Sequence, residues 1–172
     1  MFEGTYPLLM AEYNAWMNEK IYRACALLSD EARRQDRGAF FGSIHRTLDH
    51  LLWGDRAWLA RFNGKRYPVG PIGQELCADF AELRAARTVH DRELLDWARG
   101  VTREWLDKPM TWQSGVYGFT QAQPRWVLVV QMFNHQTHHR GQVHAMLTGL
   151  GIDVGPTDVP VLPVLQESGA TR

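Results

Sequence analysis

Residues 133–149 read FNHQTHHRGQVHAMLTG and contain four of the seven histidines of the chain. His135 and His139 are four positions apart, so both imidazoles project from one face if this stretch is an α-helix. The same face carries apolar residues at helical spacing, namely Leu128, Met132, Val143, Met146 and Leu150. The pattern predicts a long helix that ends at Gly149 and directs both histidines into an apolar core.

Two interpretations of this histidine pair stay open from the helix alone. A buried neutral imidazole needs a partner for each ring nitrogen, and carbonyl or hydroxyl groups of a core can supply one. Alternatively, two imidazoles one turn apart hold a shared cation. Because a His-x3-His spacing is common by chance, the choice depends on a third ligand from another part of the chain.

The composition limits the classes of protein to consider. With 172 residues, of which 45% are hydrophobic, the chain is long enough for a single domain over residues 1–172. Lys and Arg together number 19, as do Asp and Glu, and this balance argues against a nucleic-acid-binding protein. No stretch approaches the roughly 20 apolar residues of a membrane span, and no secretion signal is recognisable. We therefore expect a cytoplasmic protein without a membrane partner.

Apolar periodicity and end signals predict four long helices. The first extends from Pro7 to Leu28, and the second extends from Ser43, a favourable N-cap, to Phe62. The third extends from about Phe80 to Leu106, with Gly100 marking a bend, and the fourth is the histidine helix. The third helix is expected to expose its charged residues (Glu82, Arg84, Arg87, Asp91, Arg92, Glu93) and to bury its apolar ones (Leu83, Val89, Leu94, Trp97, Val101).

The segments between the helices differ in composition. Residues 30–40 are a charged link or a short helix, and residues 63–78 are rich in glycine and proline and predict a loop. Residues 110–119, MTWQSGVYGF, predict a short β-hairpin centred on Ser114-Gly115. Thr120 and Gln123 have the spacing of a capping box, with Pro124 in the first turn of the histidine helix.

Together these elements give an all-α fold class. The expected architecture is a four-helix bundle with a short β-hairpin before the last long helix. Residues 152–172 contain three prolines and are expected to form a mostly extended tail with at most one short helical turn.

The second helix is apolar on two sides, which is typical of a helix that lies between two neighbours. His50, Trp53 and Ala57 occupy one side, and the other carries Ile44, Leu48, Leu51, Leu52, Trp58, Leu59 and Phe62. One side could line the core while the other meets a second subunit. Bundles build metal sites from facing helices, and this helix offers His45, Asp49, His50 and Asp55. His50 is expected to be buried in mid-helix, and His45 in the first turn is expected to be exposed.

Several of these segments together resemble the DinB-like family, also called the DinB/YfiT superfamily. The resemblance is carried by SIHRTLDHLLWGDRAWLARF at residues 43–62 and by FNHQTHHRGQVHAMLTGLG at residues 133–151. The string NHxTHHRGQ within the second segment is much more specific than His-x3-His. The opening helix (YNAWMNEKIY, residues 13–22) and RGAFFGSIH at residues 37–45 extend the resemblance over most of the chain. It implies an up-and-down four-helix bundle that is commonly a homodimer.

The resemblance also implies a divalent metal ion, most often zinc or nickel, held by one histidine of the second helix and two of the fourth. Carried onto this sequence, the ligands are His50, His135 and His139, in agreement with the argument from helical faces. His138 and His144 diverge from the ligand face by about 60° and 180°. His138 is therefore expected as an outer contact or surface residue, and His144 at the surface or in an interface.

Three protein nitrogens leave at least one coordination position open, which is typical of catalytic rather than structural metal sites. Relatives in the superfamily include thiol S-transferases and a thiol-dependent maleylpyruvate isomerase that use mycothiol or bacillithiol. The resemblance thus implies a metal-dependent S-transferase that activates a low-molecular-weight thiol towards an electrophile. The alternative is a non-catalytic metal-binding stress-response or interaction protein. A solvent-reachable site below a cleft would favour the enzyme.

Other side chains near the expected site have two interpretations each. Trp53 and Met146 line an apolar pocket or belong to the core. Arg46 contacts an acidic cofactor or is solvated. Asp49 and Asp55 are candidates for contacts to the imidazoles, because histidines that bind a metal usually have such partners. The sequence assigns no general base.

Overall fold

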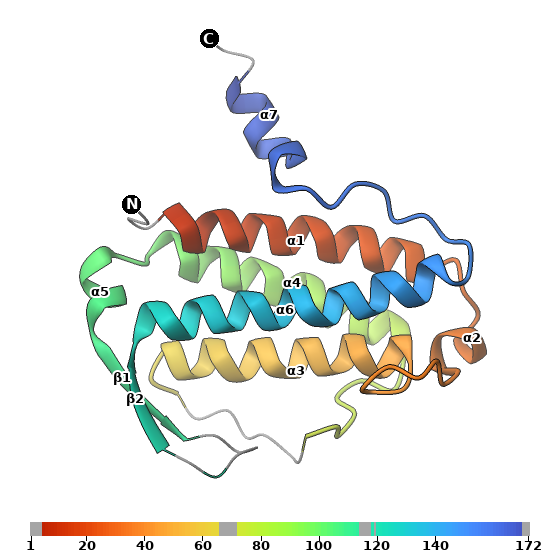
Figure 1. Ribbon diagram of the computed structural model, residues 1–172, viewed down its shortest axis with the longest axis horizontal. Helices are drawn as coiled ribbons and strands as arrows, with labels where there is room; N and C mark the ends of the chain where they lie inside the picture. Colours follow the sequence, from red (N-terminus) through yellow and green to blue (C-terminus); the bar gives the residue numbers. More distant parts are fainter. Residues whose placement is uncertain (1–4, 66–71, 114–117, 119, 170–172) are drawn as a thin grey trace.

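The computed structural model describes residues 5–65, 72–113, 118 and 120–169. Four long helices, α1 (Thr5–Cys25), α3 (Ile44–Phe62), α4 (Phe80–Arg99) and α6 (Arg125–Thr148), lie side by side (Figure 1). Strands β1 (Pro109–Gln113) and β2 (Thr120–Pro124) form an antiparallel hairpin before α6. The short elements are α2 (Asp30–Arg34), α5 (Arg103–Asp107), the 3-10 helix η1 (Val159–Val161) and α7 (Pro163–Gly169). The expected all-α fold with a hairpin before the last long helix is confirmed.

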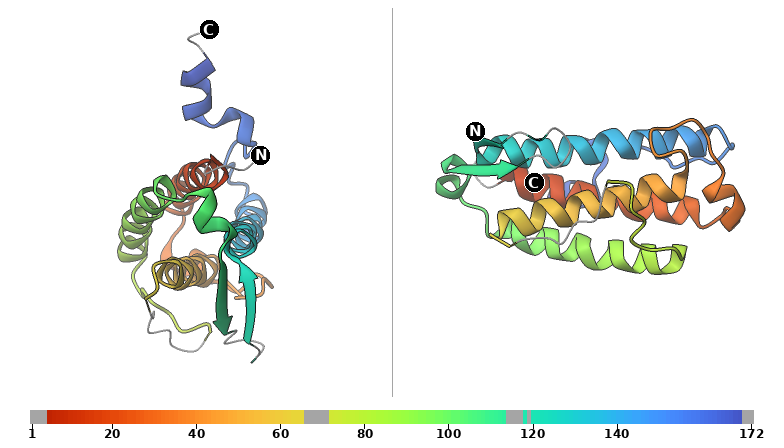
Figure 2. Two further views of the ribbon diagram at one scale, coloured as in Figure 1. Left: turned by 90° about the vertical axis from the view of Figure 1, so that its left-hand side faces the viewer. Right: turned by 90° about the horizontal axis from the view of Figure 1, so that it is seen from below.

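The four helices form a square when viewed along the bundle (Figure 2). Helices α1 and α3 lie on opposite corners, and each contacts both α4 and α6. Tyr22 at the end of α1 stacks on Phe80 at the start of α4, with ring centroids 5.8 Å apart, so these two helices are antiparallel. Phe62 at the end of α3 stacks on Trp97 near the end of α4 at 5.1 Å, so α3 and α4 are parallel.

The parallel direction of α3 and α4 differs from an up-and-down bundle, in which each helix is antiparallel to the one before it. Phe80, at the start of α4, lies beside Tyr22 at the end of the bundle opposite to Phe62, so the chain crosses the length of the bundle between α3 and α4. A crossover of this kind lets two consecutive helices run in the same direction. Because α3 is antiparallel to α6, the middle of the second long helix faces the middle of the last one.

Two apolar clusters fill the ends of the bundle. One combines Ile21 of α1 with Leu48 and Leu52 of α3 and Leu147 of α6. The other includes the fully buried Phe133 of α6 together with Phe62 of α3 and Leu94 of α4. Burial of each large apolar side chain contributes about 1.5–3 kcal/mol to folding. Between the clusters lies a layer of buried polar residues, which are Asn14, Asn18, His50, Asp55, Arg87, Asp91, Gln136, His139 and Arg140.

Side chains close the first turns of two bundle helices as the sequence indicates. The Ser43 hydroxyl accepts a hydrogen bond from Arg46 N, and Asp79 accepts one from Glu82 N. At the other end of α3, the N–H groups of Asn63 and Gly64 donate to carbonyls of the last turn. These contacts pair backbone groups that a helix leaves open at its ends, so the helix limits follow from local sequence.

The third long helix is shorter than expected, and the face that it buries differs from the predicted one. It ends at Arg99, Gly100 is its C-cap, and Thr102 caps the separate helix α5. Val89, expected inside, is 53% exposed. Arg87 and Asp91, expected in solvent, are buried and form an ion pair at 2.8 Å. The sequence pattern led to a wrong prediction, because two opposite charges one helical turn apart can also pair with each other in the protein interior.

The hairpin includes residues that were expected to cap the last helix. Pro109 pairs with Pro124 and Gln113 pairs with Thr120, so residues 120–124 are a strand and not a capping box. The N-cap of α6 is Pro124, and no side chain caps this end. Ser114 and Gly115, the expected centre of the hairpin, lie outside the described residues.

The tail contains more helix than expected, because both η1 and α7 form there. Figure 1 shows that α7 projects away from the bundle. The segment before it is anchored to α1, since the Tyr13 hydroxyl donates to Thr157 O at 2.8 Å and the Lys20 ammonium donates to Pro156 O. Within the described part of the chain, none of the helices is both long enough and apolar enough to cross a membrane.

Candidate metal centre

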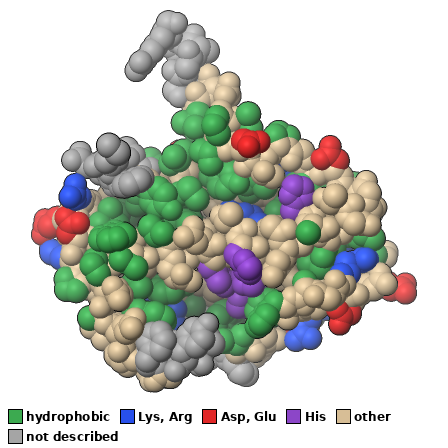
Figure 3. Space-filling model, viewed as in Figure 1, with side chains coloured by type: hydrophobic (Ala, Val, Ile, Leu, Met, Phe, Trp, Pro, Cys, Tyr) green, Lys and Arg blue, Asp and Glu red, His purple; other side chains and the backbone are tan. Residues whose placement is uncertain are grey.

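The antiparallel packing of α3 and α6 brings three histidines together in the middle of the bundle. One ring nitrogen from each of His50, His135 and His139 lies within 4.8 Å of the other two. The Nε2 atoms of His50 and His135 are 3.1 Å apart. Histidine side chains reach the surface between these two helices in the space-filling view (Figure 3). The three residues expected from the sequence therefore form one cluster.

The geometry of this cluster fits a shared cation. Two imidazoles bound to one tetrahedral zinc at about 2.0–2.1 Å have their ligating nitrogens about 3.3 Å apart. The 3.1 Å between Nε2 of His50 and Nε2 of His135 is close to this value. Nδ1 of both residues is buried without a hydrogen-bond partner among the described residues. A cation between the Nε2 atoms would leave these Nδ1 atoms unpaired, so the feature that fits a shared cation is the close approach of the two Nε2 atoms.

The electrostatic environment keeps these imidazoles neutral, which is the form that binds a metal. Burial, together with the neighbouring His135 and His139, lowers the pKa of His50 to about 3. Burial, together with His139, lowers the pKa of His135 to about 4. The pKa of His139 is also lowered, mainly by burial.

Two aromatic rings hold the His50 imidazole in place. The Phe41 ring stacks on it with a centroid distance of 3.8 Å, and the Trp53 ring stacks at 5.6 Å. Phe41 also contacts His139, at 5.4 Å. Phe41 was missed by sequence reasoning, although it lies in the RGAFFGSIH string. Trp53 contacts the site directly, whereas Met146 belongs to the apolar core.

Gln142 is a second residue that the sequence did not single out. His139 Nδ1 donates to Gln142 Oε1 at 2.7 Å, which leaves Nε2 as the nitrogen available to a metal. The Gln142 amide also lies 3.4 Å from His138 Nε2. His138 is exposed and is thus an outer contact, as expected, while the partly buried His144 is not a member of the cluster. The sequence contained a signal for this contact, because His139 and Gln142 are three positions apart and side chains at that spacing are neighbours on a helix.

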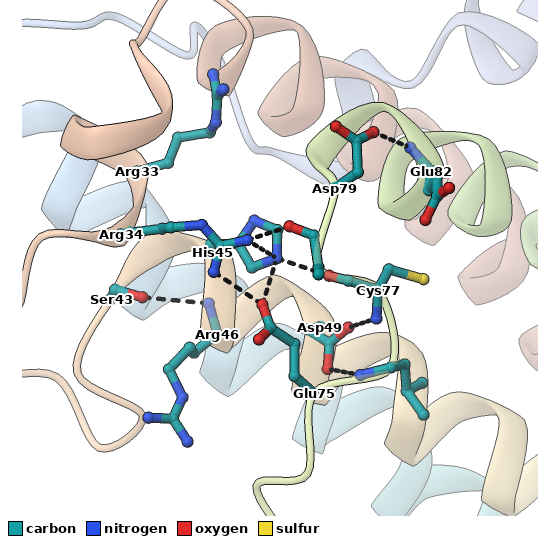
Figure 4. Close-up of polar contacts among 12 residues, drawn as sticks. Arg33, Arg34, Ser43, His45, Arg46, Asp49, Glu75, Cys77, Asp79 and Glu82 are labelled. Atoms are coloured by element: carbon teal, nitrogen blue, oxygen red, sulfur yellow. Dashed lines mark hydrogen bonds and ion pairs between the residues drawn. The ribbon is translucent and has the colours of Figure 1, made fainter.

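His45 is buried, contrary to the expectation of an exposed residue. It is 0% exposed because residues 72–79 fold across the first turn of α3 (Figure 4). Its Nε2 donates to Cys77 O at 2.8 Å and lies 3.1 Å from a carboxylate oxygen of Glu75. Arg34 of α2 pairs with the same Glu75 oxygen at 2.8 Å. His45 therefore fastens the crossover connection to α3 and lies outside the histidine cluster.

Asp49 does not contact an imidazole of the cluster, so this expectation is wrong. Its carboxylate accepts hydrogen bonds from Leu76 N at 2.8 Å and Cys77 N at 2.9 Å (Figure 4). Arg46 is exposed, and its guanidinium donates to Gly73 O at 3.2 Å. Both side chains hold the same connection that His45 holds.

Asp55 lies close to the cluster but pairs with another helix. Its Oδ2 is 2.5 Å from Arg87 Nη1, and no hydrogen bond joins it to an imidazole among the described residues. The Asp55 charge nevertheless raises the pKa of both His135 and His139, against the larger effect of burial. Asp55 thus gives the site a nearby negative charge without fixing a ring orientation.

The site is open to solvent only in part. His50 and His139 are 8% and 7% exposed, while His135 is intermediate in exposure. A cavity of about 10 Å³ lies beside His50, lined by Phe41, Asp49, Trp53 and Glu75 among others. That volume accommodates about one water molecule. Of the three histidines, only His50 is among the described residues that line this cavity, so the cavity adjoins one side of the cluster.

Comparison with known proteins identifies relatives of this chain. The model of the DinB family matches residues 1–170. The protein DinB of Bacillus subtilis (strain 168) is 30% identical over 160 residues, which cover 89% of this chain and 91% of that protein. The resemblance noted from the histidine segments is therefore confirmed. The chain belongs to the DinB family, and its three-histidine cluster fits a metal-binding member of that family.

Proposed function

We propose that the protein binds one divalent metal ion through His50, His135 and His139 and catalyses S-transfer from a low-molecular-weight thiol. The proposal rests on one observation above all, the three neutral imidazoles whose ring nitrogens lie within 4.8 Å of one another. Zinc and nickel are the proposed ions, since imidazole ligands suit both. A bound divalent ion supplies a positive charge that makes a thiol acidic enough to react as a nucleophile at neutral pH.

The residues around the cluster support a site that binds and orients its ligands. Phe41 and Trp53 fix the His50 ring, and Gln142 fixes the His139 ring. The partly exposed His135 marks the side from which a thiol approaches. In the proposed reaction the thiol sulfur forms a bond to an electrophilic carbon. The thiol proton passes to solvent, and the leaving group departs with its electron pair.

The carboxylates beside the cavity do not supply an alternative general base. Asp49 accepts two backbone hydrogen bonds, and Glu75 pairs with Arg34 and His45. A thiol made acidic by a cation needs no such base, because its proton is lost directly to solvent. S-transfer is therefore compatible with a cavity in which both described carboxylates, those of Asp49 and Glu75, are already bound to other groups.

A second candidate is a non-catalytic metal-binding protein with a stress-response or interaction role. The small volume of the cavity beside His50, about 10 Å³, favours this candidate because a substrate needs more room. A homodimer and a cytoplasmic location remain predictions under either candidate.

Metal analysis followed by thiol-transfer assays tests the proposal. The wild-type protein should contain one zinc or nickel ion per chain, and the His135→Ala variant should contain almost none. His144→Ala is the matched control, because His144 belongs to the same helix and lies outside the cluster. Equal metal content in wild type and His135→Ala would refute the ligand assignment. Metal bound by the wild type, with no turnover for any of several small thiols and electrophiles, would favour the non-catalytic candidate.

A further inference from the structure

A second pocket lies at the hairpin end of the bundle and is lined by three cationic side chains. Arg61 and Lys65 reach it from the end of α3 and the residues after it, and Arg125 reaches it from the start of α6. None of the three lies within ion-pair distance of a carboxylate in the described part of the chain. Residues 66–71 and 114–119, which follow Lys65 and Gln113 in the sequence, include no Asp or Glu.

The two arginines of this pocket are held by aromatic rings. The Arg61 guanidinium lies 5.0 Å from the ring centroid of Trp58, and the Arg125 guanidinium lies 4.8 Å from that of Trp105. Arg125 Nε is buried and has no hydrogen-bond partner among the described residues. Stacking fixes each guanidinium plane, which reduces the entropy lost when it binds a ligand.

Burial makes an uncompensated charge in this pocket costly. Arg61 is partly buried, and burial lowers its pKa, with no carboxylate acting in the opposite direction. A bound anion would remove this cost, because it pairs with the guanidinium in a setting from which water is partly excluded. The pocket is therefore better suited to a negative ligand than to a neutral one.

The N-terminus of α6 beside the pocket adds to its positive potential. No acidic residue lies in the first turn of α6, and no side chain caps it. A helix N-terminus of this kind attracts anions. The end of α3 has the opposite polarity, but N–H groups of Asn63, Gly64 and Lys65 donate to its last carbonyls. These bonds pair carbonyls that would otherwise oppose the positive N-terminus of α6.

The remaining walls suit an aromatic or apolar body. Phe62, Met110 and Trp112 provide the large apolar surfaces, and the small or polar residues Ala57, Gly64, Thr111 and Gln113 complete the lining. The space that these residues enclose with the cations is about 540 Å³. Small-molecule sites usually have volumes of about 300–1,000 Å³ and combine apolar walls with a few polar groups. Both the volume and the lining match that description.

We propose that Arg61, Lys65 and Arg125 bind the carboxylate or phosphate group of a small organic anion whose aromatic or apolar part contacts Trp112. This site is separate from the histidine cluster, since Arg61 is eleven positions from His50 and thus about 16 Å away along α3. The two residues nevertheless lie on the same side of that helix, so the pocket and the cluster open along one face of the bundle.

Calorimetric titration with phenyl phosphate and with benzoate tests this site. Saturable binding with one ligand per chain is expected for at least one of the two, and their relative affinities decide between phosphate and carboxylate. Benzyl alcohol, which has a similar apolar body and no charge, should bind at least about tenfold more weakly. Comparable binding of the alcohol, or no binding of either anion, would overturn the proposal.

Variants then assign the binding to the pocket. Arg61→Gln should weaken anion binding by about tenfold or more, and Arg61→Lys by less, because lysine keeps the charge. Arg23→Gln is the matched control, since Arg23 is likewise in the last turn of a long helix but does not line the pocket. Thermal unfolding of each variant checks that the fold is intact. Equal affinities of folded Arg61→Gln and Arg23→Gln would refute the assignment.

Chelator treatment separates this site from the metal proposal. Protein as purified and protein stripped of metal should bind the anion with the same affinity, because no histidine lines the pocket among the described residues. An affinity that disappears with the metal would place the anion at the histidine cluster instead and would overturn the proposed pocket.

Discussion

Gly54 of α3 lies directly against the imidazole of His135 of α6. A Cβ atom at position 54 would be 3.1 Å from His135 Cε1 and 3.6 Å from His135 Nδ1. The absence of a side chain therefore lets the His135 ring approach α3 closely enough for its Nε2 to lie 3.1 Å from that of His50. A glycine inside a helix lowers the stability of the fold by about 0.5–1 kcal/mol relative to alanine. The close approach of the histidines therefore comes with a loss of helix stability.

Replacing Gly54 by alanine should weaken metal binding by about tenfold, because the new methyl group displaces the His135 ring by a few tenths of an ångström. Competition with a chromogenic chelator measures the affinity. Gly141→Ala is the control, since a Cβ at this other helical glycine would meet nothing within 4 Å. That variant should keep the wild-type affinity and gain up to about 1 kcal/mol of stability. Equal metal affinity in both variants would contradict the role given to Gly54.

Gln142 should tune the affinity of the site through His139. Gln142→Leu removes the acceptor that lies 2.7 Å from His139 Nδ1, and metal affinity should fall by about tenfold or more. Gln142→Glu keeps an acceptor in the same place and should retain most of the affinity. The same chelator competition distinguishes the two variants. If both bind metal as the wild type does, the Gln142 contact has no influence on the cluster.

Arg87 should be important for stability. Its guanidinium pairs with Asp55 at 2.5 Å and with Asp91 at 2.8 Å, and its side chain is 3% exposed. Arg87→Met leaves two buried carboxylates without their cation and should cost about 3–5 kcal/mol of unfolding free energy. Arg99→Met breaks the exposed pair with Asp96 and should cost at most about 1 kcal/mol. Urea unfolding of the two variants makes the comparison, and similar losses would show that the buried pair is not stabilising.

Acid should destabilise the metal-free protein through the histidine cluster. The pKa of His50 is lowered from 6.5 to about 3 and that of His135 from 6.5 to about 4. The folded state therefore favours the neutral imidazoles. Their contribution to the free energy of unfolding is fully present above about pH 6.5 and decreases as the pH falls towards 4. Urea midpoints of chelator-treated protein between pH 7.5 and pH 4.5 should show this decline.

A histidine variant identifies the source of that pH dependence. His50→Gln removes the imidazole with the lowest pKa of the cluster, so its midpoint should decline less steeply over the same range. Parallel declines in wild type and variant would mean that other groups cause the acid sensitivity.

The local sequence was sufficient where a signal acts within one helix. Ser43 caps the helix that follows it, as its position indicated, and Asp79 caps α4 through the same kind of contact. The stripe that contains His135 and His139 predicted a helix with both imidazoles on one face, and α6 has that geometry. The periodicity of α3 predicted burial on two sides, and both its apolar residues and His50 are buried.

The sequence was insufficient where a residue's environment comes from another segment. His45 is in the first turn of a helix, and its burial depends on residues 72–79, which cross it. Arg87 and Asp91 have the spacing of a solvated helix face, and only the position of Asp55 on a neighbouring helix makes them an interior pair. Residues 120–124 became a strand because Gln113 to Pro109 are available as a partner.

By itself, then, the sequence determined the four long helices, most of their limits and the histidines that share a face. These properties depend on side-chain periodicity and on hydrogen bonds within a few residues. The tertiary structure decided the parallel direction of α3 and α4, the approach of His135 to Gly54 and the pocket formed by Arg61, Lys65 and Arg125. Each of these requires groups far apart in the chain to meet, and the energy of such contacts depends on burial and distance, which are properties of the packed bundle.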